Sequence, residues 1–345
     1  MNQGNDPRKS LRISLVGNRF QHENDRQSLI SSLRQSLWFL IPEKNKKPLA
    51  TNVIFDVTDE ECDEMFQALS QDTNAPWHEE VKYLSKSWVK AVMSQPYRKN
   101  KKMRRPFDYA KKKIVDYLDW RAKNNITKEI AYYSALEDGK EFTKVLKTGG
   151  HDLYWYGVDK DGCPNLWYRA DMTIFEKVEV RKTPKASALI MQAALDKMPS
   201  NIHNFNFIVV FDKFNVFKAM SKPTLAPAFV RTFLKISPDR LKPAYFITGG
   251  AGGFFFDIAA KIAPASVMDK TTKCKSREEA ADLLQRDGIL KTDEIPTFMG
   301  GEYEQDENIM RNYSRMMKEI EKAMYNEAST CVHVSSNTLI CRGHF

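Results

Sequence analysis

The sequence lacks any apolar run of the roughly 20 residues that a helix needs to cross a bilayer. Its most apolar stretch, residues 249–268, is interrupted by the charged residues Asp257 and Lys261. The first residues read MNQGNDPRKS, and no apolar segment follows their positive charges, so we predict no secretory signal. These absences favour a cytoplasmic protein.

Cysteine is also scarce, and the chain has only five, an odd number without a dense framework: Cys62, Cys163, Cys274, Cys331 and Cys341. Such scattered cysteines are typical of reduced thiols, so we expect no structural disulfide. Near the C-terminus, Cys331, His333, Cys341 and His344 have the chemistry of zinc ligands, but their one- and two-residue separations are unusual for a structural site. We therefore expect no metal at these four residues and interpret them as part of a loose tail.

Catalytic motifs are missing as well. The chain contains no G-x-S-x-G elbow, no H-E-x-x-H motif and no recognisable set of nucleophile, histidine and acid. The glycine cluster TGGAGGFFF fails as a dinucleotide fingerprint, because the third glycine of a motif starting at Gly250 would fall on Phe255. We therefore expect neither an enzyme nor a cofactor.

The composition is that of a soluble globular protein. Hydrophobic residues make up 42% of the chain and charged residues 28%, and 20 Phe with 13 Tyr supply bulky apolar side chains. With 345 residues the chain is long enough for two lobes that each bury a core.

Positive charge is concentrated in one segment. The chain has 53 Lys and Arg against 44 Asp and Glu, a net charge of +9, and residues 98–113 alone contain nine cations. Such a cluster attracts an anionic phospholipid surface or a nucleic-acid backbone. A solvated loop and helix face without a partner is a third interpretation, and charge alone does not choose among the three.

The periodicity of apolar residues divides the chain. Residues 59–125 follow a helical pattern throughout, which predicts a small helical lobe. From about residue 138 to 304, predicted strands and helices alternate, the pattern of an α/β layer fold. It comprises a hairpin at 153–171, a helix at 184–197, a buried strand at 205–214, a helix at 225–234 and a second buried strand at 244–250. Beyond residue 305, Tyr313, Met316, Met317 and Met324 predict a helix packed on the body.

Three segments in the second half resemble the lipid-exchange part of a CRAL-TRIO domain. They are PDRLKPAYFITGG at 238–250, GFFFDIAAKIAP at 253–264 and IPTFMGG at 295–301, in the order of that family. In addition, FDYAKKKIVDYLDWRAKNN at 107–125 resembles the last helix of the family's N-terminal lobe. The resemblance implies an α/β fold with a helical N-terminal lobe and a mixed, mostly parallel sheet covered by an apolar lid helix. The implied divisions are an extension at 1–57, the helical lobe at 58–130, the lipid-binding domain at 131–305 and a C-terminal helix and tail at 306–345.

In this family the lid covers an apolar pocket, and the resemblance implies a carrier that transfers a hydrophobic ligand between membranes. Phosphatidylinositol is the phospholipid that we name first, and a sterol, a tocopherol or a retinoid remain alternative cargoes. The bound lipid would be cargo and not a cofactor. Each methylene kept from water contributes about 0.8 kcal/mol, so such a carrier has to enclose its cargo. The implied pocket and lid residues are Phe211, Phe246, Phe254, Phe255, Ile258 and Ile262.

The resemblance also implies a headgroup site. Family members that carry phosphatidylinositol use an acidic residue, a lysine after the lid and a basic residue of the helical lobe, which correspond here to Asp239, to Lys270 or Lys273, and to Arg105. In the alternative interpretation, Asp239 shapes the turn and pairs with Arg240 at the surface.

The family's function implies a monomer that docks transiently on an anionic membrane. We assign this docking to the cations at the start of the basic run, Arg98, Lys99, Lys101, Lys102 and Arg104. A nucleic-acid-binding protein is the alternative, although Tyr97, Phe107 and Tyr109 form no recognisable base-stacking motif.

Overall fold

A computed structural model describes residues 55–135, 151–171, 183–199, 201–212, 221, 224–236, 239–248, 253, 256–257, 260–261, 263–306, 309 and 313–332. The expected N-terminal extension and the Cys and His residues of the tail beyond residue 332 lie outside these ranges. Within them, no helix is long and apolar enough to cross a membrane.

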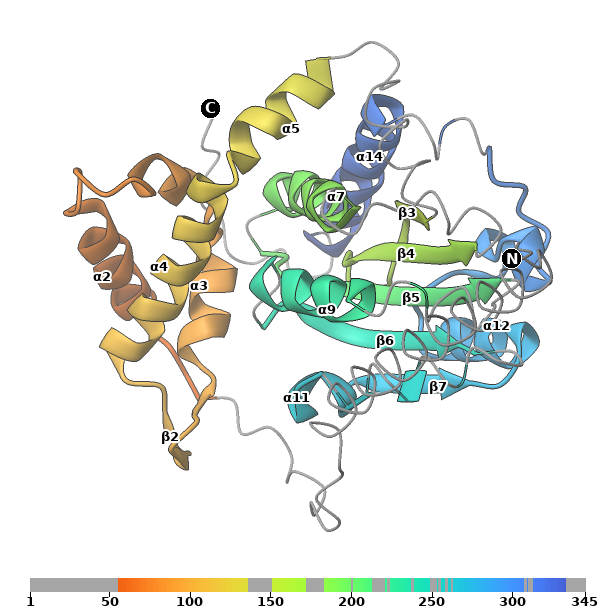
Figure 1. Cartoon of the computed structure of the whole chain (residues 1–345), viewed down its shortest axis with the longest axis horizontal. Helices are drawn as coiled ribbons and strands as arrows, with labels where there is room; N and C mark the ends of the chain where they lie inside the picture. Colours follow the sequence, from red (N-terminus) through yellow and green to blue (C-terminus); the bar gives the residue numbers. More distant parts are fainter. Residues whose placement is uncertain are drawn as a thin grey trace, which may run out of the picture. The chain divides into compact units, whose positions relative to one another are not determined.

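The first part of the described chain is a lobe built mainly from helices (Figure 1). Its elements are α2 (Asp59–Ser70), the 3₁₀ helix η1 (His78–Tyr83), α3 (Lys86–Met93), α4 (Phe107–Lys123) and α5 (Ile126–Ala135). Thr58 starts α2 with a capping box, because its side chain accepts from the Glu61 backbone while the Glu61 carboxylate accepts from the Thr58 backbone. The apolar faces of these helices form one core that includes Met65, Trp88, Ile114 and Leu118.

The prediction that residues 59–125 are helical throughout is wrong for the segment between α3 and α4. Between α3 and α4 the chain forms an antiparallel hairpin of β1 (Pro96–Tyr97) and β2 (Asn100–Arg104). Pro96 lacks a backbone N–H and biases the preceding residue away from the helical region, so a helix has to end before it. The following cations provide no apolar stripe that could restart a helix against the core. The basic run therefore begins on a hairpin.

The second lobe contains a five-stranded sheet in the order β3–β4–β5–β6–β7. The strands are β3 (His151–Val158), β4 (Pro164–Asp171), β5 (Phe205–Asp212), β6 (Leu241–Ile247) and β7 (Thr271–Cys274). β3 and β4 form the expected antiparallel hairpin, in which Gly162 takes a φ of 77°. The remaining neighbours pair in parallel, so the sheet is mixed and mostly parallel, as the family resemblance implied.

Helices cover both faces of this sheet. On one face lie α7 (Thr183–Lys197) and α9 (Leu225–Ile236), where the Trp155 indole donates to the Ile190 carbonyl and Phe233 packs edge-on against Phe205. On the opposite face lies α12 (Arg277–Arg286), where the Tyr245 hydroxyl donates to Asp287 at the end of that helix. Because both faces are covered, β5 and β6 are rich in buried apolar residues.

Two further elements complete the lobe. The C-terminal helix α14 (Tyr313–Val332) packs against β3, α5 and α7, and it buries Tyr313, Met316, Met317 and Met324. The prediction of a helix packed on the body is therefore confirmed. A short helix α11 (Ala265–Met268) precedes β7.

The segment IPTFMGG contains a tight loop with two glycines, and each position requires glycine for a different physical reason. The 3₁₀ helix η4 (Thr297–Met299) ends at Gly300, which takes a φ of 88°. At Gly301 a Cβ atom would lie 2.1 Å from the Ile295 carbonyl oxygen, so no other residue fits without moving the backbone. The first glycine therefore provides conformation and the second provides close approach.

The expected lid helix is described only in part. Gly253, Phe256, Asp257, Ala260 and Lys261 have helical backbone, in agreement with the prediction. Phe254, Phe255, Ile258 and Ile262, which we assigned to the pocket and lid, lie outside the described residues.

Candidate functional site

The candidate site begins where the two lobes meet at the start of β6. Asp239 lies two residues before this strand and takes a φ of 59°, a left-handed conformation that aspartate tolerates better than most residues. Its carboxylate accepts from Nη1 of Arg105 at 2.7 Å, across 134 residues of sequence. The exposed fractions are 13% for the Arg105 side chain and 23% for Asp239. The pair is thus shielded but reachable from solvent.

Arg105 is positioned by its own lobe. It follows β2, its backbone N–H donates to the Gln95 carbonyl, and its Nη1 also donates to the Val92 carbonyl at 2.9 Å. Its Nε is buried and has no hydrogen-bond partner among the described residues. A buried donor without a partner is uncommon and points to a missing acceptor. Arg105 therefore has a free donor beside the carboxylate that it already contacts.

Lys270 lies at the same end of the sheet. Its ammonium group donates to the Leu241 carbonyl at 2.8 Å, two residues beyond Asp239. Burial lowers the pKa of Lys270, and the nearby Asp239 carboxylate opposes this shift. His203 lies within the electrostatic reach of Lys270 and Arg240, and its pKa is lowered to about 4, chiefly by burial. Arg105 and Lys270 therefore both lie beside Asp239 at this end of the sheet.

Lys273, the alternative lysine, is in a different place. The strand register sets Lys273 beside Phe246, and its ammonium group contacts Asp257 at 3.2 Å and lies 5.0 Å from the ring centre of Phe256. The structure thus brings Arg105, Asp239 and Lys270 to one end of the sheet. It places Lys273 farther along β7, beside the described residues of the expected lid.

An apolar floor extends along the sheet from this charged end. Phe207, Phe211 and Phe246 point to the same face, because Phe207 and Phe211 are on alternate positions of β5 and Phe246 pairs in register with Val209. Phe246 packs against Phe256 with ring centres 5.4 Å apart, and Phe207 stacks on Phe233 of α9 at 5.1 Å. The three floor rings are only partly buried. Two of them, Phe211 and Phe246, were assigned to the pocket from the sequence.

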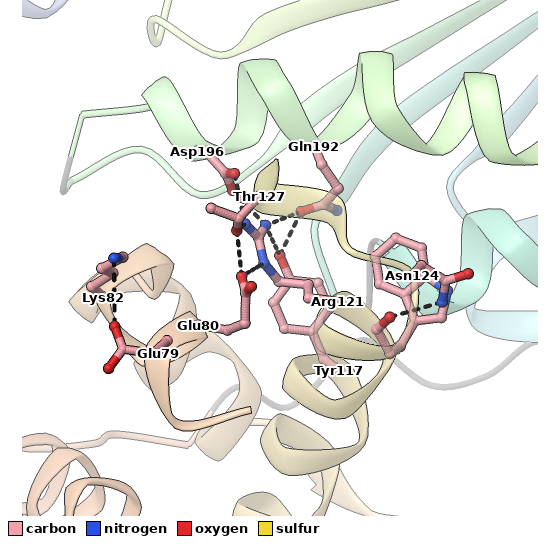
Figure 2. A network of polar contacts seen from close by, with 10 residues as sticks. Glu79, Glu80, Lys82, Tyr117, Arg121, Asn124, Thr127, Gln192 and Asp196 are labelled. Carbon is pink, nitrogen blue, oxygen red and sulfur yellow. Dashed lines mark hydrogen bonds and ion pairs between the residues drawn. The ribbon is translucent and has the colours of Figure 1, made fainter. Parts of the chain in front are cut away.

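A buried polar network joins the helical lobe to the sheet lobe (Figure 2). Arg121 of α4 donates to both carboxylate oxygens of Asp196 on α7, with Nη1 at 2.7 Å and Nη2 at 2.8 Å. Its Nε donates to Glu80 of η1 at 2.8 Å, and its Nη1 also donates to Gln192. The Arg121 side chain is 0% exposed. These contacts fix α4 and η1 of the helical lobe against α7 of the sheet lobe.

Arg240 connects this network to the candidate site. It follows Asp239 directly, is 2% exposed, and its guanidinium lies 4.7 Å from the ring centre of Trp88 and 5.9 Å from that of Tyr117. The Tyr117 hydroxyl in turn donates to Gln192. The expectation of a surface ion pair between Asp239 and Arg240 is therefore wrong. Because aromatic rings of the helical lobe cover Arg240, Asp239 is left to pair with Arg105.

Sequence reasoning missed this supporting layer. Glu80 and Asp196 were not singled out, because charged residues at helical spacing are usually interpreted as solvated faces, and Arg240 was considered only as a surface partner of Asp239. The one available signal was the segment at 107–125, which contains Arg121 and was noted only as part of a family resemblance.

The docking cations divide into two groups in the structure. Arg98, Lys99, Lys101 and Lys102 are exposed on the hairpin, whereas Arg104 is held by Glu61 of α2 and by the Asp56 carbonyl. Arg104 is thus engaged within the lobe. No group of three or more metal-ligating side chains occurs among the described residues, which do not reach the ligand set of the tail.

Three comparisons with known proteins were made. A search of the curated proteins gave no match. Among solved structures, one titled "Crystal structure of Sfh5" is similar, with a TM-score of 0.49 and 13% identity over 79% of this chain and 100% of that chain. The family model described as the CRAL/TRIO domain matches residues 149–301, a range that contains all five strands of the sheet and the IPTFMGG loop. Residues 149–301 of this chain form a CRAL/TRIO domain.

Proposed function

We propose that this protein binds a phospholipid and carries it between membranes. The CRAL/TRIO domain supports the binding of a lipophilic ligand in general. The proposal of a phospholipid depends on one observation: the surroundings change along the sheet from the cations beside Asp239 to the aromatic floor at Phe246. Asp239 and Phe246 are seven residues apart, roughly 20 Å along an extended chain. The chains of one lipid leaflet span about half of a 30 Å hydrocarbon core, which fits this length.

The headgroup in this proposal is phosphatidylinositol. Its phosphodiester lies between Arg105 and Lys270, where the buried Nε of Arg105 supplies a donor that the described residues leave without a partner. Asp239 accepts from a hydroxyl of the inositol ring, so the ion pair with Arg105 rearranges when lipid binds. Charge-assisted hydrogen bonds to phosphate are among the strong ones, and arginine is well suited to them.

Carriers of a sterol, tocopherol or retinoid have less use for this charged end, since those ligands bear no phosphate. The chemistry of the described site also favours a carrier over an enzyme. Its cations and its carboxylate bind and orient a headgroup, and no described nucleophile faces them with a base. We therefore propose reversible binding without bond cleavage.

We further propose that the protein is cytosolic and meets membranes transiently. The nucleic-acid alternative finds less support in the hairpin region. Tyr97 and Tyr109 contact each other edge-to-face with ring centres 5.2 Å apart, and the ammonium group of Lys113 lies 6.0 Å from the ring centre of Tyr109. These rings are engaged with the protein's own side chains and offer no open platform for bases.

The test is lipid transfer between vesicles by the single variants Lys270→Ala and Lys273→Ala, measured in parallel for phosphatidylinositol and phosphatidylcholine. Lys270→Ala removes a phosphate contact of about 1 to 3 kcal/mol, so transfer of phosphatidylinositol should fall about five- to a hundredfold. Transfer of phosphatidylcholine should change much less. Lys273→Ala removes an equal charge away from Asp239 and is the matched control.

Equal losses for both lipids in Lys270→Ala would indicate a folding or pocket defect. A selective loss of phosphatidylinositol transfer in Lys273→Ala alone would indicate that the headgroup binds on the lid side of the sheet. The absence of any transfer by the unaltered protein, for every common lipid class, would contradict the proposed function itself.

A further inference from the structure

We propose that the β1–β2 hairpin is a membrane-docking element that places four cations and one methionine on an anionic phospholipid surface. The inference rests on the proposed function only in requiring a membrane encounter, and it is independent of which lipid is the cargo. Figure 1 shows the hairpin extending beyond the helices of its lobe.

The hairpin carries positive charges that form no ion pairs with other described residues of the protein. Arg98, Lys99, Lys101 and Lys102 are all exposed, and none has an ion-pair partner within the described part of the chain. By contrast, two other exposed lysines of this lobe are paired, Lys82 with Glu79 and Lys123 with Asp119. Part of the excess positive charge of the lobe is therefore displayed on the hairpin.

The turn itself is unusual in composition. Tyr97 pairs with Asn100, so Arg98 and Lys99 form the two-residue connection. Such connections usually contain glycine, asparagine or aspartate, which tolerate positive φ angles. Neither Arg98 nor Lys99 has a positive φ. The tip thus carries two cations where local backbone preference favours other residues, a departure of the kind expected at functional positions.

An apolar side chain accompanies the charge. Met103 is 53% exposed, one of three large hydrophobic residues that are exposed in the described ranges. On β2, Met103 directly follows Lys101 and Lys102 in the stretch between the paired residues Asn100 and Arg104, where the strand register shifts. A flexible thioether among cations suits the boundary between headgroups and acyl chains, where apolar burial and charge attraction act together.

The base of the hairpin is anchored on two sides, which distinguishes it from a loose loop. Arg104 is bound by Glu61 of α2, and Arg105 by Asp239 at the start of β6. An isolated two-stranded hairpin is marginally stable in water, so these contacts hold it in place. Docking at the tip therefore brings an anionic surface close to the residue that we assign to the headgroup.

The experiment uses the full chain and sedimentation with vesicles of phosphatidylcholine containing phosphatidylserine, at physiological salt. Lys101→Glu with Lys102→Glu is compared with Lys82→Glu with Lys123→Glu, because both double variants change the net charge equally. Each cation near an anionic surface is worth about fivefold in binding, so the hairpin variant should bind at least 25-fold more weakly. The control should change less than threefold. At constant salt, Met103→Gln should also weaken binding, because it removes the apolar contribution without changing the charge.

Equal weakening by the two double variants would overturn the proposal, because binding would then follow net charge and not the hairpin. Binding of single-stranded DNA that depends on the hairpin and exceeds binding to the vesicles would overturn it in favour of nucleic acid. Unchanged thermal unfolding of the hairpin variant excludes a folding defect. Retained loading of lipid in a docking-defective variant would separate this inference from the proposed function, since cargo binding would survive without membrane recognition.

Discussion

Two arginines of the helical lobe pair with carboxylates of the sheet lobe, and their surroundings differ sharply. Arg121 contacts Asp196, Glu80 and Gln192, and its side chain is completely buried. Arg105 contacts Asp239 at 13% exposure and keeps a buried Nε without a described partner. One arginine is fully satisfied by the protein, and the other is not.

The difference separates structure from function at the same lobe junction. A buried charge that is completely paired cannot accept a ligand without losing its partners, so the Arg121 network joins the lobes. The Arg105 pair is close to solvent and belongs to a positively charged group, so it can exchange one anionic partner for another.

The largest predicted effect is on stability. Arg121→Met should lower the free energy of unfolding by about 3 to 5 kcal/mol, because Asp196 and Glu80 would remain buried without their cation. Arg105→Met should cost about 1 kcal/mol or less, since its carboxylate partner stays accessible to water. Urea denaturation of both variants measures the contrast. Equal losses of unfolding free energy in the two variants would contradict the assignment of a structural role to Arg121 and a binding role to Arg105.

The second prediction concerns acid pH. Burial lowers the pKa of His203 to about 4 in the folded state, against about 6.5 when unfolded. The unfolded state therefore binds the proton more readily, and stability that is present above pH 6.5 is lost as the pH falls toward 4. The loss amounts to about 3 kcal/mol over this window. His203→Gln should remove this part of the acid sensitivity, which denaturation at pH 7 and pH 4.5 would measure. A parallel pH dependence in the variant would contradict the assignment.

The third prediction separates recognition from stability at the candidate site. Arg105→Lys keeps the charge but loses the second and third donor positions of the guanidinium. Transfer of phosphatidylinositol should therefore fall about five- to tenfold, with thermal unfolding almost unchanged. Transfer of phosphatidylcholine serves as the internal control. An equal loss of transfer for both lipids would indicate that Arg105 has a structural role, like Arg121.

The smallest effect is expected at the base of the hairpin. Arg104 holds the pKa of the Glu61 carboxyl at about 2, well below its usual range. The stabilisation is therefore present above the ordinary glutamate pKa of about 4.3 and is lost as the pH falls toward 2. Because the pair is partly exposed, Glu61→Gln should cost no more than about 1 kcal/mol at pH 7. The difference from the unaltered protein should shrink at pH 3, and a constant difference would mean that the charge is not involved.

Much of the fold could be predicted from sequence pattern, because its signals are local. The continuous apolar run at 205–211 indicated a buried parallel strand, and Asp-Lys-Asp-Gly between aromatic strands indicated the β3–β4 hairpin. The β1–β2 hairpin was missed because its residues are cations without an alternating pattern. β7 was missed for a similar reason, since Thr271–Cys274 is short, polar and at the sheet edge.

The site was less predictable because its contacts join distant parts of the chain. No local pattern indicates that Arg105 meets Asp239, and only a family resemblance suggested it. The choice between Lys270 and Lys273 depended on strand register, which places them in different surroundings. The burial of Arg240 depended on Trp88 and Tyr117, two rings of the other lobe.

The central claim is that this protein holds a phospholipid by its headgroup and its chains. The most direct measurement is mass spectrometry of lipids that copurify with the full recombinant chain, after exposure to a mixture of common lipid classes. The account predicts about one phospholipid per protein, with phosphatidylinositol enriched over its share of the mixture. Recovery of no lipid, or only of neutral lipids such as sterols, would contradict it.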